Sequence, residues 1–290
     1  MGMVIMMQGG FWVHRAIDVD KPLFRCMKLQ HVADLIENNR LFFNQVLRWD
    51  DTWEIPTRFY KTELDDILSL KIKNTNFVAD TLYGTCWTNI ETSDALWRIY
   101  SGVEKDGVCI QTTVRKLFES IDFSQLTNNC VDGFVAPIRY ENLGNTPNME
   151  VFKDDEAETY PRNMMPAFIK RNAFSHESEI RFLVHAARGK NGYPGNPLNI
   201  AIDGSHMYLP LKNTDFIDQL ILDPRLTQEE FKYKSKCHQY LGKPIIKSTL
   251  YDTPDRIFEI VHSSGAKDWV SLKGARRWSY GDFRKIGNDT

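Results

Sequence analysis

The chain lacks the sequence signatures of the commonest nucleotide-binding and hydrolytic enzymes. It contains no G-x-x-x-x-G-K-[ST], no G-x-G-x-x-G, no H-E-x-x-H and no G-x-S-x-G. These absences disfavour Walker-type NTPases, Rossmann dinucleotide enzymes and the common metallo- and serine hydrolases. The sequence also has no internal repeat, low-complexity tract or long block of one charge, which argues against solenoids and largely disordered chains.

Metal-ligand spacings and long apolar runs are also missing. The seven histidines are scattered and the cysteines form no C-x-x-C pair, so we predict no metal site. The apolar start over 1–8 is too short for a signal peptide or a spanning helix, so we expect a cytoplasmic protein without membrane contact. An odd number of widely spaced cysteines predicts free thiols in a reducing compartment. The five are Cys26, Cys86, Cys109, Cys130 and Cys237.

The bulk composition is that of an ordinary globular protein. Of its 290 residues, 42% are hydrophobic and 26% are charged. A formal net charge of -2 and a pI near 6.4 give no global reason to expect a nucleic-acid target, although they allow a local basic face. We favour one α+β domain over 1–255, followed by a basic, aromatic extension over 256–290.

Helices and short strands alternate through the first half, and strands dominate the second. Helical periodicity and capping residues predict helices over 29–39, 62–68, 93–100 and 227–241. Short apolar or β-branched runs predict strands near 41–43, 84–88, 108–111, 177–186, 198–203, 206–211 and 245–250. The polar segment 142–166 is either a lid over a site or a linker.

The alternating charges of Glu177-Ser178-Glu179-Ile180-Arg181 are the strongest candidate for a functional centre. On a strand, Glu177, Glu179 and Arg181 share one face, and the residues between them share the other. Two carboxylates beside one guanidinium form either a fully solvated face or a prepared site, because the carboxylates repel each other unless something compensates. Periodicity alone favours the solvated face.

A second acidic group lies in Trp49-Asp50-Asp51-Thr52-Trp53-Glu54, after the predicted strand at 41–43. Its carboxylates cap a local turn, bind a cation or position a ribose. Aspartates beside a turn most often accept hydrogen bonds from nearby backbone, so the structural role is favoured.

The last 24 residues are locally basic and interleaved with aromatic side chains. Such a tail either contacts nucleic acid or forms a solvated extension with its aromatic rings docked on the core, and its charge density favours the extension. Three acids stand against six basic residues, which are Lys267, Lys273, Arg276, Arg277, Arg284 and Lys285.

Four segments resemble, in order, a bacterial domain family of unknown function. The first is Leu23-Phe24-Arg25 with Asn39-Arg40-Leu41-Phe42-Phe43, and the second is the acidic turn at 49–54. The third is Cys86-Trp87-Thr88 with Leu96-Trp97-Arg98-Ile99-Tyr100 and Gly107-Val108-Cys109-Ile110. The fourth is Lys170-Arg171 with Phe174 and Glu177-x-Glu179-x-Arg181. The resemblance covers residue 23 to about 185, with a weaker echo at Ile221-Leu222-Asp223-Pro224.

An early arginine, a middle hydroxyl-bearing strand and a late E-x-E strand are also similar to the arrangement in ADP-ribosyltransferases. This resemblance implies a split, mainly antiparallel β core and NAD as co-substrate. It implies that Glu179 stabilises an oxocarbenium-like state and that Glu177 binds or deprotonates the acceptor. Arg25 would bind the NAD pyrophosphate or ribose, and Thr88 would replace the serine that many of these enzymes carry in the middle strand.

The same resemblance suggests further contacts. Trp97 and Tyr100, one helical turn apart, either wall a nicotinamide pocket or belong to the core. Asp51, Arg171 and Arg181 are expected to bind substrate. The acceptor would be a macromolecule, with nucleic acid favoured over protein, and the chain would act as a toxin or antiphage effector with a cognate inhibitor protein.

Two other functions fit the residues. In a metal-dependent nuclease, Asp50, Asp51, Glu54, Glu177 and Glu179 would gather around magnesium or manganese. In a non-catalytic binding module, the charged strand would be a solvated face. Convergence of the early arginine, the middle-strand threonine and the late glutamate on one cleft would favour the transferase.

Overall fold

The computed structural model describes residues 5–6, 11–51, 54, 81–91, 93–126, 131–142, 165–186 and 204–252. The chain divides into two compact units, Met1–Tyr251 and Asp252–Thr290, and every element described below belongs to the first. The predicted helix at 62–68, the strand at 198–203, the basic tail and nearly all of the predicted lid at 142–166 lie outside the described residues. The domain boundary near 255 stays a prediction.

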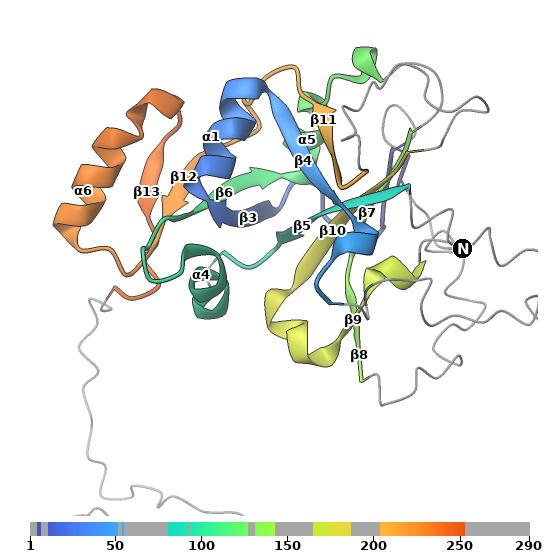
Figure 1. Ribbon diagram of the computed structural model, residues 1–290, viewed down its shortest axis with the longest axis horizontal. Helices are drawn as coiled ribbons and strands as arrows, with labels where there is room; N and C mark the ends of the chain where they lie inside the picture. Colours follow the sequence, from blue (N-terminus) through green and yellow to red (C-terminus); the bar gives the residue numbers. More distant parts are fainter. Residues whose placement is uncertain are drawn as a thin grey trace, which may run out of the picture. The chain divides into compact units, whose positions relative to one another are not determined.

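Most of the described strands form one sheet in the order β1-β2-β7-β10-β5-β3-β6-β12-β13 (Figure 1). Their bounds are Ile5–Met6, Phe11–Val13, Val131–Pro137, Glu179–Ala186, Leu82–Thr88, Pro22–Lys28, Gly107–Thr113, Gln219–Leu222 and Ile245–Lys247, in that order. Strand β4 (Arg40–Gln45) joins the sheet through β5 and pairs with β11 (His206–Pro210). The pairings β2–β7 and β12–β13 are parallel, and the others within this sheet are antiparallel. A separate parallel pair joins β8 (Arg139–Glu141) to β9 (Ile169–Arg171).

The described α-helices are short, and their ends follow ordinary capping chemistry. They are α1 (Leu29–Asn38), α4 (Asp94–Ser101), α5 (Val114–Ser120) and α6 (Gln228–Cys237). The side chains of Ser93 and Thr113 accept the capping backbone N–H groups of α4 and α5, and Thr227 with Glu230 forms the predicted capping box of α6. None of the described helices is long and apolar enough to cross a membrane.

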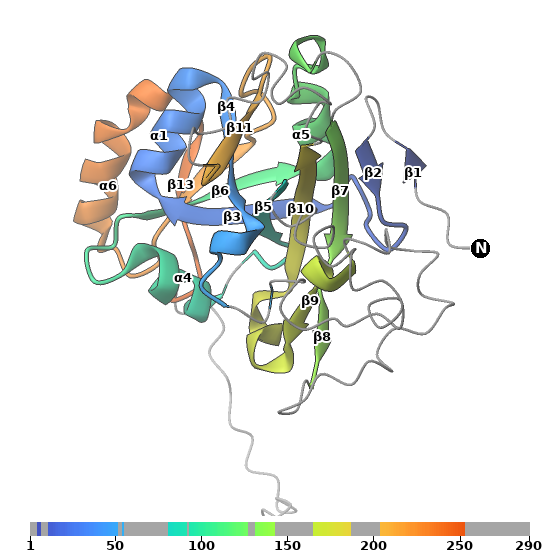
Figure 2. The same cartoon turned by 45° about the vertical axis from the view of Figure 1, so that its right-hand side comes forward.

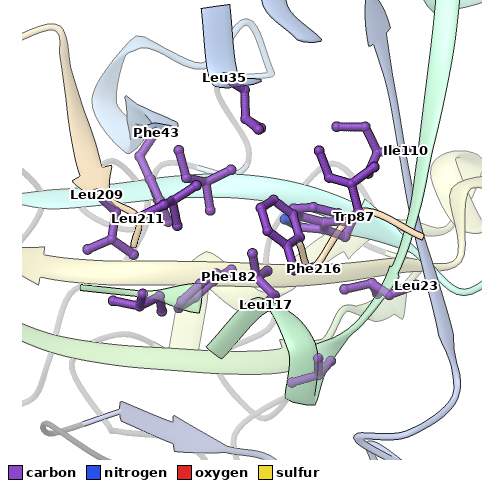
Figure 3. Packing of buried hydrophobic residues seen from close by; sticks show 14 of the residues in the cluster. Leu23, Leu35, Phe43, Trp87, Ile110, Leu117, Phe182, Leu209, Leu211 and Phe216 are labelled. Carbon is purple, nitrogen blue, oxygen red and sulfur yellow. The ribbon is translucent and has the colours of Figure 1, made fainter. Parts of the chain in front are cut away.

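One face of the sheet, here called the core face, carries the main hydrophobic core, to which α1 and α5 contribute buried side chains. Figure 2 shows these two helices beside the strands. Side chains alternate along β10, so Ile180, Phe182 and Val184 point into this core. Phe182 and Trp87 pack among aliphatic side chains from several strands and helices (Figure 3). Burying each such side chain contributes about 1.5–3 kcal/mol, so this face supplies most of the driving force for folding.

The opposite face, here called the site face, carries two small apolar clusters with charged groups between them. Leu183 of β10 belongs to one cluster, and Phe24 of β3 belongs to the other, which α4 covers through Trp97. Between these clusters β3 and β5 pair only at Phe24 and Thr88, so the sheet is split there. The predicted α+β class with a split, mainly antiparallel core is confirmed.

Two details of the sequence interpretation are wrong. The strand predicted over 177–186 begins at Glu179, because Ser178 adopts a left-handed conformation (φ 41°, ψ 52°) that ends a 3₁₀ helix, η9 (Asn172–Glu177), and turns the chain. The prediction of five free thiols fails at Cys26 and Cys109, which face each other across β3 and β6 and form a disulfide.

Candidate active site

A network of buried charges lies at the start of β10 on the site face. The Arg181 guanidinium is fully buried and donates from Nε to Glu179 Oε1 at 2.7 Å. It also donates from Nη2 to Glu54 Oε2 at 2.6 Å and from Nη1 to the Ala167 carbonyl oxygen at 2.5 Å. The Trp49 ring centroid lies 4.3 Å from Arg181 Cζ. Every side of this guanidinium therefore meets an acceptor or an aromatic face.

Lys170 connects three carboxylates at the centre of the network. Its Nζ lies 2.7 Å from Glu177 Oε2, 3.2 Å from Glu54 Oε1 and 3.3 Å from Glu179 Oε2. With every group charged, these three carboxylates and the two cations Lys170 and Arg181 leave one excess negative charge in a site largely removed from water. Such a site stabilises positive charge that develops beside it.

The network keeps Glu179 ionised. Burial opposes the charged form most strongly, but the ion pair and hydrogen bonds with Arg181, aided by Lys170, outweigh it and hold the pKa of Glu179 below its ordinary value. Burial, followed by the charge of Glu179, raises the pKa of the neighbouring Cys86 thiol, so this cysteine stays protonated. Glu179 therefore acts as a fixed anion and hydrogen-bond acceptor at neutral pH.

The turn between the two glutamates is fixed by side chains at the end of β5. Thr88 Oγ1 donates to the Glu177 carbonyl oxygen at 2.7 Å and accepts from the Ile90 N–H at 3.1 Å. Ser178 Oγ donates to Asn89 Oδ1 at 2.7 Å. These bonds hold Ser178 in its strained left-handed conformation, which lets both Glu177 and Glu179 reach Lys170 although only Glu179 lies on the strand.

A pocket, here called the Arg25 pocket, opens beside this network at the split between β3 and β5. Its lining includes Arg25, Thr88, Tyr100, Glu177 and Glu179, and its volume including the open mouth is about 310 Å³. The early arginine, the middle-strand threonine and the late glutamate therefore converge on one cleft. Their side chains come from β3, β5 and β10, so sheet topology unites residues about 150 positions apart in the sequence.

The Arg25 guanidinium makes no hydrogen bond or ion pair with any described residue. Its Cζ lies 5.7 Å from the centroid of the Trp87 ring. Burial holds the pKa of Arg25 below its ordinary value. Arg25 still carries a full charge at neutral pH, and no carboxylate of the described residues is paired with its guanidinium.

Comparisons with known proteins yield only distant structural likenesses. No protein-family model and no curated protein matches the chain. The structure of Thermus sp. 2.9 DarT in complex with NAD+ overlaps with a TM-score of 0.36 at 9% identity, covering 80% of this chain and 96% of that chain. Thermus sp. 2.9 DarT in complex with ADP-ribosylated ssDNA gives a TM-score of 0.34 at 10% identity, covering 80% and 95%. Overlaps of this size assign neither an activity nor a substrate to the present chain.

Not every residue expected to contact substrate faces the Arg25 pocket. Trp97 is 1% exposed and packs against Phe24, whereas Tyr100, one turn later, is 40% exposed and lines the pocket. Burial raises the pKa of Tyr100 to about 12, so its hydroxyl remains protonated. Of the three residues assigned to substrate binding, Arg181 is fully buried, and Arg171 donates to Asp51 at 3.1 Å.

The acidic groups do gather as the nuclease alternative requires, but around an ammonium group. Glu54, Glu177 and Glu179 all lie within 3.3 Å of Lys170 Nζ, which takes the central position that a divalent cation would need. Asp50 is exposed, and Asp51 pairs with Arg171. Within the described part of the chain, no cluster of metal-ligating side chains has the geometry to hold an ion.

Sequence reasoning missed the role of Lys170 and of Tyr140. In the sequence, Lys170 stands out only together with Arg171, as part of the fourth matching segment. The structure places it on β9, with its Nζ within hydrogen-bond distance of Glu179. The Tyr140 hydroxyl accepts the Glu179 N–H at 2.8 Å. No local pattern marks either residue, because both reach the site through the small β8–β9 pair.

Proposed function

We propose that this chain is an NAD-dependent ADP-ribosyltransferase that modifies nucleic acid. The observation that carries the proposal is the Arg25 pocket, which is lined by two carboxylates and by a guanidinium that has no ion pair among the described residues. An anion-binding group and a cation-stabilising group in one pocket suit a substrate with a pyrophosphate and a glycosidic bond to a leaving base. NAD is such a substrate.

Arg25 supplies the anion site in this proposal. Its guanidinium donates to the NAD pyrophosphate, which replaces the missing carboxylate partner. The pocket is shallow, because its volume of about 310 Å³ includes the open mouth, so it would hold only the part of NAD nearest Glu179 while the rest of the dinucleotide lies outside. The protonated Tyr100 ring forms one wall against the nicotinamide.

Glu179 stabilises the bond-breaking step. The bond between ribose C1′ and the nicotinamide nitrogen breaks, its electron pair leaves with nicotinamide, and positive charge develops on the ribose. The fixed carboxylate of Glu179 lies beside that charge and accepts a hydrogen bond from the ribose hydroxyl. A nucleophilic atom of the acceptor then bonds to C1′, and its proton passes to the more exposed Glu177.

The choice of nucleic acid as acceptor is part of the proposal and is supported by the basic, aromatic sequence after residue 255. Lys170 and Arg171 give no such support, because carboxylates in the described structure pair with both. A role as a toxin or defence effector, with a cognate inhibitor protein, belongs to the same proposal.

Kinetics on the purified chain test the proposal. The chain is incubated with NAD and single-stranded oligonucleotides, and nicotinamide release is followed by chromatography. Mass spectrometry of the oligonucleotides then measures the mass increase expected for one added ADP-ribose. Arg25→Met should raise the KM for NAD about tenfold or more, because a charge-assisted contact to the pyrophosphate is lost. Arg98→Met, an exposed arginine of α4, is the matched control and should leave KM unchanged.

A chelator separates the transferase from a nuclease. EDTA should leave nicotinamide release intact, because no metal takes part. Degradation of the oligonucleotide that EDTA stops, with NAD left untouched, would instead establish the metal-dependent nuclease.

A further inference from the structure

A second pocket, here called the Asn89 pocket, lies against Glu179 beside the first. Its volume including the open mouth is about 710 Å³, compared with about 310 Å³ for the Arg25 pocket. Glu179 lines both pockets, and Asn89, Tyr140 and Lys21 line the second one alone. The proposed transfer reaction needs two binding sites that meet at one carboxylate, and NAD accounts for only one of them.

The two pockets are lined by the same chain segments. At three places, neighbouring residues line different pockets. The pairs, with the Asn89 pocket residue first, are Leu23 and Phe24, Asn89 and Thr88, and Ser178 and Glu177. Glu179 stands at the boundary between the two.

We propose that the Asn89 pocket is the acceptor subsite and that it binds an unpaired nucleobase bearing ring carbonyl groups, together with its phosphate. This inference rests on the proposed function and extends it, because it names the part of the acceptor that is recognised. Two features of the pocket carry it: its free hydrogen-bond donors and its apolar wall.

The free polar groups of the pocket are donors. Asn89 Oδ1 already accepts from Ser178 Oγ at 2.7 Å, which leaves the Nδ2 protons without a partner among the described residues. Tyr140 accepts the Glu179 N–H, so its own hydroxyl proton is left to donate, and burial raises the pKa of Tyr140 to about 12. Two directed donors match ring carbonyl oxygens of a base.

The pocket also contains two carboxylates. Glu179 is held by Arg181 and Lys170, whereas Asp18 is exposed and lies 3.9 Å from Lys21 Nζ. Apolar side chains such as Ile17 and Ile138 form the remaining wall, against which a planar ring packs. The side chain of Lys21 is 77% exposed at the rim, where it suits a phosphate.

Base preference is the measurement that tests this subsite. Oligothymidylate, whose bases carry ring carbonyls, and oligoadenylate, whose bases carry none, are compared for binding by fluorescence anisotropy without NAD and for modification with NAD. The wild-type chain should prefer oligothymidylate. Asn89→Asp keeps the oxygen that accepts from Ser178 but replaces the free donor with an acceptor, so the preference should fall about tenfold. Comparing the two oligonucleotides within one variant cancels any change in its folding or in its reaction with NAD.

Lysine variants provide the second arm. Lys21→Met should weaken binding of both oligonucleotides equally and reduce the slope of log Kd against log salt by about 1. Lys232→Met, an exposed lysine of α6, is the matched control and should change neither quantity.

The outcomes separate this inference from the proposed function. An unchanged base preference in Asn89→Asp, or modification of protein acceptors alone, would overturn the subsite. Binding that depends on Asn89 and Lys21 in a chain that never releases nicotinamide would keep the subsite and contradict the transferase.

Discussion

Two arginines near the site face are held in opposite ways. Arg181 is fully buried and donates to Glu179, Glu54 and a backbone carbonyl. Arg25, on the other side of the split in the sheet, lies over an aromatic ring and makes no ion pair within the described structure. Glu179 raises the pKa of Arg181 above its ordinary value against the effect of burial, while burial alone decides the lowered pKa of Arg25.

The difference separates an arginine that stabilises the fold, Arg181, from one that is available to bind a ligand, Arg25. Removing one partner of a buried charge network leaves the others uncompensated, so a fully paired guanidinium is tied to folding. A partly buried guanidinium without an acid partner contributes little to stability. Its role is to bind a ligand. The following variants test this contrast between the two arginines.

Arg181→Met should have the largest effect on stability. It leaves Glu54 and Glu179 buried without their guanidinium and should lower the free energy of unfolding by about 3–5 kcal/mol. Urea unfolding at several pH values measures this loss. Because protonation relieves an unpaired carboxylate, the loss should be smaller at acid pH. A loss that does not change with pH would show that missing packing, rather than charge, is responsible.

Acid should destabilise the wild-type chain through the same network. The pKa of Glu179 is lower in the folded chain than its ordinary value, so its contribution to stability is present in full above the ordinary pKa. That contribution is lost as the pH falls below the ordinary pKa and through the lowered one. In Glu179→Gln the acid limb of the stability curve should be flatter than in the wild type. Parallel curves for the two proteins would contradict the assignment.

Thr88→Val should have an intermediate effect. It removes the hydroxyl that bonds the Glu177 carbonyl and the Ile90 N–H, and the loss of a partner by these two partly buried groups should cost about 1–2 kcal/mol. Thr88→Ser keeps the hydroxyl and should retain most of that stability. A similar loss in both variants, measured by urea unfolding, would mean that the methyl group and not the hydroxyl holds the turn.

Arg25→Met should have the smallest effect on folding. With no ion pair to lose, the free energy of unfolding should change by less than about 1 kcal/mol, while the KM for NAD rises. Thermal unfolding and kinetics on the same preparation measure both. A loss of stability comparable with that of Arg181→Met would make Arg25 a structural residue.

Local sequence patterns predicted the regular elements well. The helix ending at Asn39, the capping box at Thr227 and the strand near 84–88 all follow from short-range chemistry. Periodicity did not predict the burial of Glu179 and Arg181, because the compensating charges of Glu54 and Lys170 come from distant segments. The same limit applies to Ser178, whose left-handed turn is held by Thr88 and Asn89, about 90 residues away.

The resemblance to ADP-ribosyltransferases predicted the convergence of Arg25, Thr88 and Glu179, which composition and periodicity could not. It did not separate Tyr100 from Trp97, because the two differ by less than one helical turn in position and only the packing of α4 decides which is buried. The Asn89 pocket had no sequence signal at all. Its residues come from short segments far apart in the sequence, and they meet only in the folded chain.

The most direct test of the central claim is the rate of nicotinamide release from NAD by Glu179→Gln. The variant keeps the size of the side chain and a carbonyl oxygen for Arg181, and it removes the negative charge. We predict a fall in kcat of about 100-fold or more with little change in KM, because the charge acts on the transition state rather than on binding. A folded variant with a kcat within about twofold of the wild type would contradict the assignment of Glu179.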